Sequence, residues 1–564
     1  MPDEFFQAGP RLGNQYQEDP LLRRFFAWRL PQEVLAAIAP GLVRLGERVV
    51  GDIWRMAEDA EQSPPRLFHF DPWGQRVDRI QTTWGWQALH RVSAEEGLVA
   101  VAYERGEGVW SRVHQMARLY LFHASSAMYS CPLAMTDGAA RVIEIYGDEG
   151  LLNHPFKRFI TREADDFWTS GQWMTERIGG SDVDGSTTQA HPTGGQYRLY
   201  GAKWFTSATT AEAAMVLAKI AGDDRLSLFY LETRDGEGRW NGIEIERLKD
   251  KLGTRAMATA ELSLHGAVAR MIGEPGKGVR TIATLLNITR LYNAVAAVSY
   301  MRRGIALARD YAGKRQAFGK RLSEHPLHLE TLARLEVEFQ AAFHLTFHLG
   351  LLAGKSDLSQ ANESEQAVLR LLIPVVKLFT AKQAVAVLSE AIECFGGAGY
   401  IEDTGLPRLL RDCQVLPIWE GTTNILSVDV LRVLRERNVF AHFSSDLEAR
   451  LHRVDHPSLS AIRECIARSA ARLGAYLQWH WDADSEAQEA GARLLAFSIA
   501  RVAAAALMAE FADWALKRGQ NDAQLSLDRW CAEELAPALR CEQGYRQETR
   551  QLALGAHRWK SQNE

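Results

Sequence analysis

The residue pattern of this chain changes twice along its length, from helical to strand-like and back, and this change constrains the fold most strongly. Between residues 170 and 272, Gly, Ser and Thr become frequent, and apolar residues alternate with polar ones in short runs such as 197–200, 226–231 and 261–264. Alternation with a period of two, bounded by turn residues, predicts short strands. Because no helical segments separate them, we expect a compact antiparallel barrel or sandwich.

Helical periodicity dominates on both sides of this β region. In residues 109–123, apolar side chains recur at every third or fourth position, which is typical of an amphipathic helix. Residues 365–395 have the pattern of one long helix with an apolar stripe, and Gly396 and Gly397 predict its end.

The last part of the chain begins with a polar segment at residues 437–446. Ser445 followed by Glu448 has the spacing of a capping box, which predicts the start of a new helical region there. We therefore expect an α+β fold with four domains. These are a helical domain at 1–160, a β domain at 161–275, a second helical domain at 276–436 and a helical extension at 437–564.

Composition and charge exclude several classes of protein. The 564 residues are 46% hydrophobic and 24% charged, which is ordinary for a globular chain and excludes a disordered or fibrous one. The net charge of −5 argues against a dedicated nucleic-acid binder. Residues 1–15 lack the basic and apolar regions of a signal peptide, and no uninterrupted apolar run reaches the roughly 18 residues of a membrane span. The six cysteines form no CxxC pair, so we expect reduced thiols and a cytoplasmic location.

Several short motifs favour ordinary structure over a ligand site. Residues 273–278, GEPGKG, lack the full pattern of a phosphate-binding P-loop and predict a turn that leads into a helix. His344 and His348 have the spacing of two metal ligands on a helix, but Leu345 stands where an HExxH site needs Glu. No glycine-rich dinucleotide motif follows a predicted strand. We expect neither a metal site nor a Rossmann nucleotide site.

Two other stretches combine residue types that can carry chemistry. Residues 174–182, MTERIGGSD, place hydroxyl and acidic groups around a glycine pair, where backbone amides can approach a polar ligand. Residues 393–424 contain a glycine-rich segment and then Glu420, which follows the apolar run 415–419. A carboxylate in apolar surroundings is suited to act as a base. The alternatives are a plain glycine-rich turn for the first stretch and an ordinary acid at a helix N-terminus for Glu420.

Taken together, these stretches resemble signatures of the acyl-CoA dehydrogenase family. Residues 174–182 are similar to its flavin loop, and 393–412 to its second signature. Three further matches occur in the family's order, and these are KWFTS at 203–207, KLGTR at 251–255 and RQAFG at 315–319. The resemblance is strong over 160–436. The motif IWEG at 418–421 and the C-terminal extension are most similar to the AidB-like branch.

The resemblance implies a fold and an activity. The fold has a helical N-terminal domain, a middle antiparallel β-barrel domain, a helical bundle domain and, in this branch, an extra helical C-terminal domain. The activity is FAD-dependent dehydrogenation of an acyl-CoA thioester, in which Glu420 removes the α-proton and a hydride passes from the β-carbon to flavin N5. The implied partners are acyl-CoA, a flavin electron acceptor such as electron-transfer flavoprotein, and further copies of the chain, usually in a tetramer.

The resemblance also implies roles for individual residues. Those that match the family's FAD-binding positions are Met174, Thr175, Gly180, Ser181, Phe205, Ser207, Arg315, Phe318, Gly396, Gly397, Thr422 and Asn424. Those that match acyl-CoA-binding positions are Ser181, Arg290 and Gly421. In the family, the positions of Arg315 and Phe318 reach the FAD of a neighbouring subunit.

Some positions depart from the family pattern. Asn287 stands where the family often has Asp, and Trp173 stands where a small residue is usual. We expect these changes to affect thioester binding more than FAD binding. The bulky side chains of Trp173 and Trp419 are expected to narrow the acyl pocket toward short or branched chains.

Two alternative functions use the same fold. One is an AidB-type flavoprotein that binds DNA, with incidental dehydrogenase activity; its basic surface would come from a stripe of arginines in the C-terminal extension, although acidic residues outnumber basic ones there. The other is a flavin oxidase, for which Glu420 in place of Asp is unfavourable. The arginines of the basic stripe that DNA binding would need are Arg450, Arg453, Arg463, Arg468 and Arg472.

Overall fold

The N-terminal part of the chain is helical, as its sequence pattern predicts. The computed structural model describes residues 7–537 and 541–555; residues 1–6, part of the segment in which no signal peptide is expected, lie outside them. Asp19 caps the first helix by accepting a hydrogen bond from the Leu22 backbone amide. The helices here are α1 (Pro20–Arg29), α2 (Gln32–Arg48), α3 (Asp52–Gln62), α4 (Trp84–Glu95), α5 (Ala100–Glu104), α6 (Ser111–His123), α7 (Ser130–Tyr146), α8 (Glu149–Leu151) and α9 (Lys157–Phe159).

A β-hairpin that the sequence pattern does not predict interrupts these helices. Strands β1 (Arg66–Phe70) and β2 (Arg76–Gln81) pair antiparallel. The Asp71 carboxylate accepts hydrogen bonds from the backbone amides of Trp73 and Gln75, at 2.8 and 2.9 Å. Such side-chain bonding to the next residues of the backbone is what makes Asp a turn former, so the turn chemistry fixes this hairpin locally.

The middle part is a closed barrel, which confirms the β region that the alternation predicts. Its strands are β3 (Ser170–Trp173), β4 (Gln189–Thr193), β5 (Gln196–Ser207), β6 (Ala213–Ile220), β7 (Leu226–Glu232), β8 (Ile243–Leu248) and β9 (Thr259–Ile272). The order is β3-β6-β4-β5-β9-β7, and β7 pairs again with β6, which closes the sheet. Most pairings are antiparallel, as expected, but β6 pairs parallel with both β3 and β4.

Three long helices form the centre of the molecule. Helix α10 (Gly278–Lys314) begins directly after the turn that the GEPGKG segment predicts. Helix α11 (Pro326–Asp357) and helix α12 (Glu363–Glu393) pack against it, and α12 ends just before Gly396, as the glycine pair predicts. The elements that accompany these helices are β10 (Gln316–Ala317), β11 (Lys320–Arg321), α13 (Leu406–Cys413) and α14 (Thr423–Leu434).

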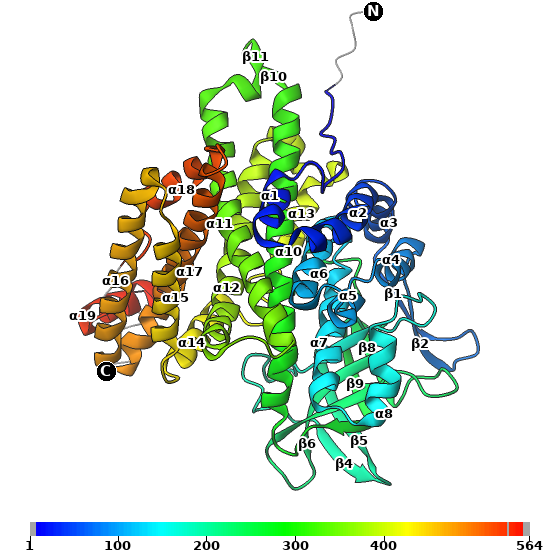
Figure 1. Ribbon diagram of the computed structural model, residues 1–564. Helices are drawn as coiled ribbons and strands as arrows, with labels where there is room; N and C mark the ends of the chain where they lie inside the picture. The colour runs from blue at the N-terminus through cyan, green and yellow to red at the C-terminus, as the bar shows by residue number, and fades with distance from the viewer. Residues whose placement is uncertain (1–6, 538–540, 556–564) are drawn as a thin grey trace, which may run out of the picture.

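A further helical unit packs against the side of this bundle, and Figure 1 shows it beside α11 and α12, away from the barrel. Its helices are α15 (Val439–Arg453), α16 (Ser460–Asp482), α17 (Ser485–Leu516), α18 (Asp522–Ala532) and α19 (Gln543–Leu554). The helix start expected at Ser445 is wrong, because α15 already begins at Val439. Asn438 precedes it at φ = 66°, a left-handed conformation that Asn tolerates well.

A buried ionic cluster joins this C-terminal unit to the N-terminal helices. Glu510 of α17 lies 2.7 Å from Arg450 and 2.7 Å from Arg453 of α15, and 3.2 Å from Arg29 of α1. Its side chain is only 5% exposed. Because a buried carboxylate needs compensating cations, Glu510 ties three segments that are distant in sequence to one point.

Helices α12 and α17 are long and apolar enough to cross a membrane, by length and composition alone. Charged residues interrupt both apolar segments, Lys377 in α12 and Arg501 in α17, so neither is an uninterrupted apolar run. In α12, 78% of the most apolar window is buried inside the protein, and in α17 83%. Their apolar surface is thus covered by protein, as in core helices.

Candidate active site

Glu420 occupies a turn between α13 and α14 in an unusual backbone conformation. Its φ angle is 58°, and that of the following Gly421 is 103°. A residue with a side chain is strained at such an angle, so the surrounding structure must hold the turn in place. The alternative interpretation of Glu420, an ordinary acid at a helix N-terminus, does not hold, because α14 begins only at Thr423.

Helix α10 supplies the direct partners of Glu420. The Thr289 hydroxyl donates a hydrogen bond of 2.7 Å to one carboxylate oxygen of Glu420. The neighbouring Arg290 donates a longer bond, 3.4 Å, to the Glu420 carbonyl oxygen and an ion-pairing one, 2.9 Å, to Asp429. The Thr289 hydroxyl therefore orients the Glu420 carboxylate, while the Arg290 guanidinium holds the Glu420 backbone.

Helix α12 holds the same turn from the other side through a buried lysine. The Lys377 ammonium donates to the carbonyl oxygens of Trp419 and Gly421, at 2.6 and 2.7 Å, and is fully buried. Burial lowers the pKa of Lys377 to about 7, against the opposing effect of the Glu420 charge. The residues on both sides of Glu420 are thus fixed by one side chain.

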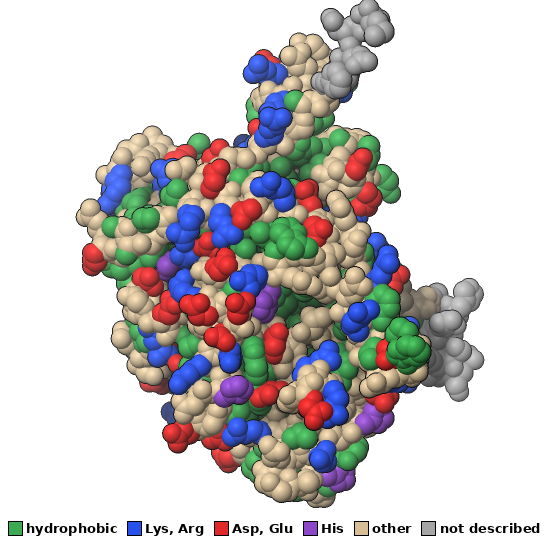
Figure 2. All heavy atoms as spheres, turned by 90° about the vertical axis from the view of Figure 1, so that its right-hand side faces the viewer, with side chains coloured by type: hydrophobic (Ala, Val, Ile, Leu, Met, Phe, Trp, Pro, Cys, Tyr) green, Lys and Arg blue, Asp and Glu red, His purple; other side chains and the backbone are tan. Residues whose placement is uncertain are grey.

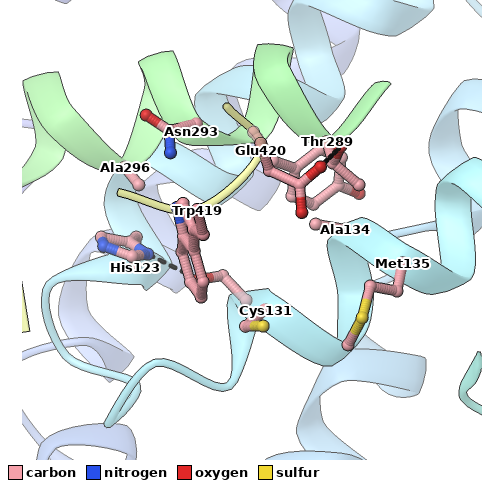
Figure 3. A pocket seen from close by; sticks show the side chains of 11 residues that line it. His123, Cys131, Ala134, Met135, Thr289, Asn293, Ala296, Trp419 and Glu420 are labelled. Carbon is pink, nitrogen blue, oxygen red and sulfur yellow. Dashed lines mark hydrogen bonds between the residues drawn. The ribbon is translucent and has the colours of Figure 1, made fainter. Parts of the chain in front are cut away.

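The Glu420 carboxylate faces a narrow cavity between α6, α7 and α10. Figure 3 shows the α10 residues on one wall and the residues of the α6–α7 segment on the other, with Trp419 between them. The cavity has about 20 Å³ of room for the centres of water molecules. The lining residues are His123, Ser130, Cys131, Ala134, Met135, Thr289, Tyr292, Asn293, Ala296, Trp419 and Glu420.

The two tryptophans expected to narrow this cavity have different positions. Trp419 lines it, and its effect on acyl-chain length stays a prediction. Trp173 does not, because its side chain is fully buried in the core of the barrel, beside Leu262 and Leu264. Trp173, which stands where the family usually has a small residue, is therefore part of the barrel core. The expectation that its side chain narrows the cavity is wrong.

The predicted flavin loop lies along the end of strand β5. The Thr175 carbonyl oxygen accepts a 2.9 Å hydrogen bond from the Trp204 backbone amide, which places Thr175 beside the strand that carries Phe205 and Ser207. A Cβ on Gly180 would lie 2.9 Å from the Thr175 hydroxyl oxygen, so glycine is needed there to leave that hydroxyl in place. Ser181 and Phe205 are exposed.

A buried ion pair fixes this loop to the barrel. The Lys203 ammonium lies 2.8 Å from the Glu176 carboxylate, and both side chains are almost fully buried. Glu176 also accepts hydrogen bonds from the backbone amide and hydroxyl of Thr187 and of Thr188. Burial alone would raise the pKa of Glu176, but the Lys203 charge and these hydrogen bonds lower it to about 2.

Four other predicted FAD residues, Arg315, Phe318, Gly396 and Gly397, lie at the opposite end of α10. Arg315 directly follows this helix, and the ring of Tyr311, in its last turns, packs 4.8 Å from that of Phe395, next to Gly396 and Gly397. Phe318 is 98% exposed at the tip of the β10–β11 hairpin. Figure 1 shows this hairpin and the barrel at opposite ends of α10. A helix of 37 residues is about 55 Å long, so one chain does not bring the two groups together.

The side chains and backbone of the two groups have the chemistry that FAD binding needs. At the barrel end, a hydroxyl and a glycine loop lie beside an exposed aromatic ring, which suits a flat ring system. At the hairpin end, Cβ atoms on Gly396 or Gly397 would meet nothing within 4 Å, so the backbone there is open to a ligand. An arginine and an exposed aromatic residue lie on the neighbouring segment, and these suit a pyrophosphate and a base.

Three further predicted residues are already engaged within the chain. The Thr422 hydroxyl caps α14 by accepting from the Ile425 backbone amide. Asn424 accepts a 3.3 Å hydrogen bond from Arg493 of the C-terminal unit. Arg290 pairs with Asp429, as described above. Their roles in ligand binding stay predictions.

The sequence analysis did not identify Thr289 and Lys377, although the sequence around each residue contains a feature that points to it. Thr289 directly precedes Arg290, which the resemblance singles out. Lys377 is the one charged residue in the apolar run 371–381 of α12, and a lone charge on a buried helix face often marks a site.

No group of His, Cys, Asp or Glu side chains suited to hold a metal ion occurs in residues 7–537 or 541–555. His348 lies 3.0 Å from Arg450, and His344 is buried among aromatic rings. Burial lowers the pKa of His344 to about 3, so this side chain is a neutral core residue.

In the described part of the C-terminal unit, the five arginines expected to form a basic stripe are each engaged by a group of the same unit. Arg450 and Arg453 pair with Glu510, Arg468 with Glu464 and Arg472 with Glu534, while Arg463 donates to the Val454 carbonyl oxygen. On the opposite side of the molecule, which carries the N-terminal helices and the barrel, Figure 2 likewise shows basic and acidic side chains interspersed. A duplex-binding face needs an excess of one charge, so these arginines give the DNA hypothesis no support.

Four protein families match consecutive parts of the chain. The family of the acyl-CoA dehydrogenase middle domain matches residues 171–267, and that of the acyl-CoA dehydrogenase C-terminal domain matches 276–434. The N-terminal domain family of the adaptive response protein AidB matches 10–165. A family described as acyl-CoA dehydrogenase 11 C-terminal domain-like matches 438–554.

Individual proteins are similar over most of the chain. Acyl-CoA dehydrogenase family member 11 of Caenorhabditis elegans is 42% identical, over 95% of this chain and 90% of that protein. Putative acyl-CoA dehydrogenase AidB of Escherichia coli is 33% identical, over 67% of this chain and 70% of that protein. The crystal structure of C. elegans ACDH-11 in complex with C11-CoA has a TM-score of 0.95 at 41% identity, covering 98% of this chain and 97% of that one. The chain described here therefore belongs to the acyl-CoA dehydrogenase family.

Proposed function

We propose that this chain is an FAD-dependent dehydrogenase that introduces a double bond between the α- and β-carbons of an acyl-CoA thioester, with Glu420 as the base. The observation that carries this proposal is the position of the Glu420 carboxylate, which faces a narrow cavity and is held there by Thr289. The C11-CoA bound to the C. elegans relative supports a thioester as the ligand.

The residues around the cavity divide the work. Glu420 takes the α-proton on one carboxylate oxygen, while Thr289 holds the other by its hydroxyl and thereby orients the base. Lys377 and Arg290 keep the strained turn in position by bonding to its carbonyl oxygens. Trp419 and Met135 cover the cavity with apolar surface and exclude water. Bound FAD supplies an acceptor for the hydride that leaves the β-carbon.

The cofactor is proposed to lie between two copies of the chain. Met174, Thr175, Gly180, Ser181, Phe205 and Ser207 would hold it at the barrel end, with Thr422 and Asn424. Arg315, Phe318, Gly396 and Gly397 of a second copy would complete the site, because about 55 Å of helix separates them from the barrel in their own chain. This arrangement requires at least a dimer, and we propose a tetramer. Ser181, Arg290 and Gly421 would contact the acyl-CoA.

An anaerobic titration tests the proposal. Purified protein with bound FAD is mixed with acyl-CoA thioesters of increasing length, and loss of the flavin absorbance is followed. We expect at least one thioester to bleach the flavin, and Glu420→Gln to slow bleaching by at least about 100-fold, because a general base is lost. Glu464→Gln, on the exposed face of α16, is the matched control. Absence of bleaching with every thioester, or equal rates in the Glu420→Gln protein, contradicts the proposal.

A further inference from the structure

Among the residues that the structure describes, three side chains that line the cavity beside Glu420 each carry a buried polar atom with no hydrogen-bond partner. These atoms are Nε2 of His123, Oδ1 of Asn293 and Nε1 of Trp419. His123 and Asn293 are each only 2% exposed. Because well over nine in ten buried polar groups in proteins are hydrogen-bonded, three orphaned atoms around one small cavity indicate a missing polar partner.

His123 and Asn293 lie apart from the carboxylate that is proposed to take the proton. Figure 3 shows His123 and Asn293 on one side of the Trp419 ring, and Glu420 with Thr289 on the other. An acyl chain whose α-carbon lies beside Glu420 would therefore reach these atoms with carbons farther along the chain. The polar partner belongs to the distal part of the acyl group rather than to the thioester.

The neighbours of each side chain define what the partner must offer. The Asn293 amide nitrogen donates to the Leu416 carbonyl oxygen at 3.1 Å, which fixes the amide orientation and leaves Oδ1 as a free acceptor. The Trp419 indole nitrogen can only donate. His123 Nδ1 lies 2.5 Å from the Ser130 hydroxyl, and burial lowers the pKa of His123 to about 3, so a neutral ring offers Nε2 as either donor or acceptor.

We infer that this pocket selects acyl groups that carry a hydroxyl, or another oxygen function that both donates and accepts, beyond the position of Trp419. A hydroxyl can donate to Asn293 and accept from Trp419. The inference rests on the proposed function, since it assumes that an acyl thioester occupies this cavity.

A plain hydrocarbon chain would fill the same space without satisfying these atoms. Each buried group left unpaired weakens binding by roughly 5- to 150-fold, and sites built to bind a hydroxyl discriminate strongly against analogues that lack it. A water molecule is the competing occupant, and a hydrocarbon chain long enough to reach the pocket would have to displace it.

The test compares two series of thioesters, butanoyl- to octanoyl-CoA and ω-hydroxyacyl-CoA compounds with the same number of chain heavy atoms. Binding is measured by calorimetry, and flavin bleaching anaerobically, with the intact FAD-containing protein. We expect the hydroxylated member to have the lower Kd and the higher kcat/KM, by about tenfold or more, at one or two chain lengths. Asn293→Leu and His123→Phe should remove this preference, and Glu464→Gln, on the exposed face of α16 and outside the cavity, should keep it.

The outcomes separate the inference from the proposed function. If hydrocarbon chains bind as tightly as hydroxylated ones at every length, and Asn293→Leu changes neither, the inference is overturned and water fills the site. If the hydroxylated series binds more tightly but nothing bleaches the flavin, the proposed function fails and the pocket preference stands. Should Asn293→Leu not fold, because it also loses the bond to Leu416, Trp419→Phe removes a single donor and gives the same test.

Discussion

The Lys377 ammonium lies 2.6 Å from the carbonyl oxygen of Trp419, one residue before the proposed base. It also bonds to Gly421, so one buried cation fixes both neighbours of Glu420. Replacement by methionine leaves the carbonyl oxygens of Trp419 and Gly421 without this partner and frees a turn held at a positive φ angle.

We expect Lys377→Met to lower kcat by about 10- to 100-fold while KM changes little, because a displaced base is felt in the chemical step more than in binding. Steady-state kinetics with the best thioester measure this. Lys382→Met, on the same helix, is the control. An unchanged kcat in the Lys377→Met protein would show that the turn holds itself in place.

The same lysine predicts how stability depends on pH. The pKa of Lys377 is lowered to about 7 in the folded protein, whereas a lysine in an unfolded chain has a pKa of about 10.4. Between these values the unfolded chain binds more protons, so Lys377 makes the free energy of unfolding rise with pH across this window. Urea denaturation at several pH values should therefore give a smaller rise for Lys377→Met than for the parent protein. Equal slopes would mean that Lys377 titrates normally.

Thr289 offers a sharper probe of the base, since valine has nearly the same shape. Thr289→Val removes the hydroxyl that donates to Glu420 at 2.7 Å. A hydrogen bond to a charged group is worth about 1.5–3 kcal/mol, so we expect kcat/KM to fall by roughly 10- to 150-fold. Thr281→Val, which removes a hydroxyl bonded to the Lys277 carbonyl oxygen on the same helix, should leave the kinetics unchanged.

Glu510 tests how the C-terminal unit is attached. Glu510→Ala leaves the buried Arg450 without its 2.7 Å partner and also frees Arg29 and Arg453. Breaking a buried ion pair from one side costs about 3–5 kcal/mol, which should appear as a lower urea midpoint or a separate early transition. Glu464→Ala, whose exposed pair with Arg468 measures 3.8 Å, should change little. If both variants unfold alike, the attachment rests on apolar packing alone.

Local patterns predicted those parts of the fold that depend on neighbouring residues. The alternation in 226–231 became β7, and the glycine pair at 396–397 marks the end of α12, because each signal lies within the element that it specifies. The Ser445 capping pattern failed for a related reason. Asn438 starts α15 earlier, and nothing local to Ser445 shows that the chain is already helical there.

The site itself could be predicted only in part. Resemblance singled out Glu420, but Thr289 is 131 residues away in sequence and Lys377 is 42 residues from Trp419. Such contacts depend on how α10 and α12 pack, which no short motif records. The orphaned atoms of His123 and Asn293 were equally out of reach, because whether a polar atom has a partner is a property of the assembled core.

The length of α10 has a genetic consequence. On the proposed arrangement, each FAD takes one set of contacts from the barrel end of one copy and the other set from the hairpin end of its neighbour. A copy damaged only at Thr175 and a copy damaged only at Phe318 would each be inactive alone. Mixed in one cell, they would form hybrid assemblies in which some sites receive two undamaged halves. Alleles at the two ends of this helix should therefore complement each other, whereas two alleles at the same end should not.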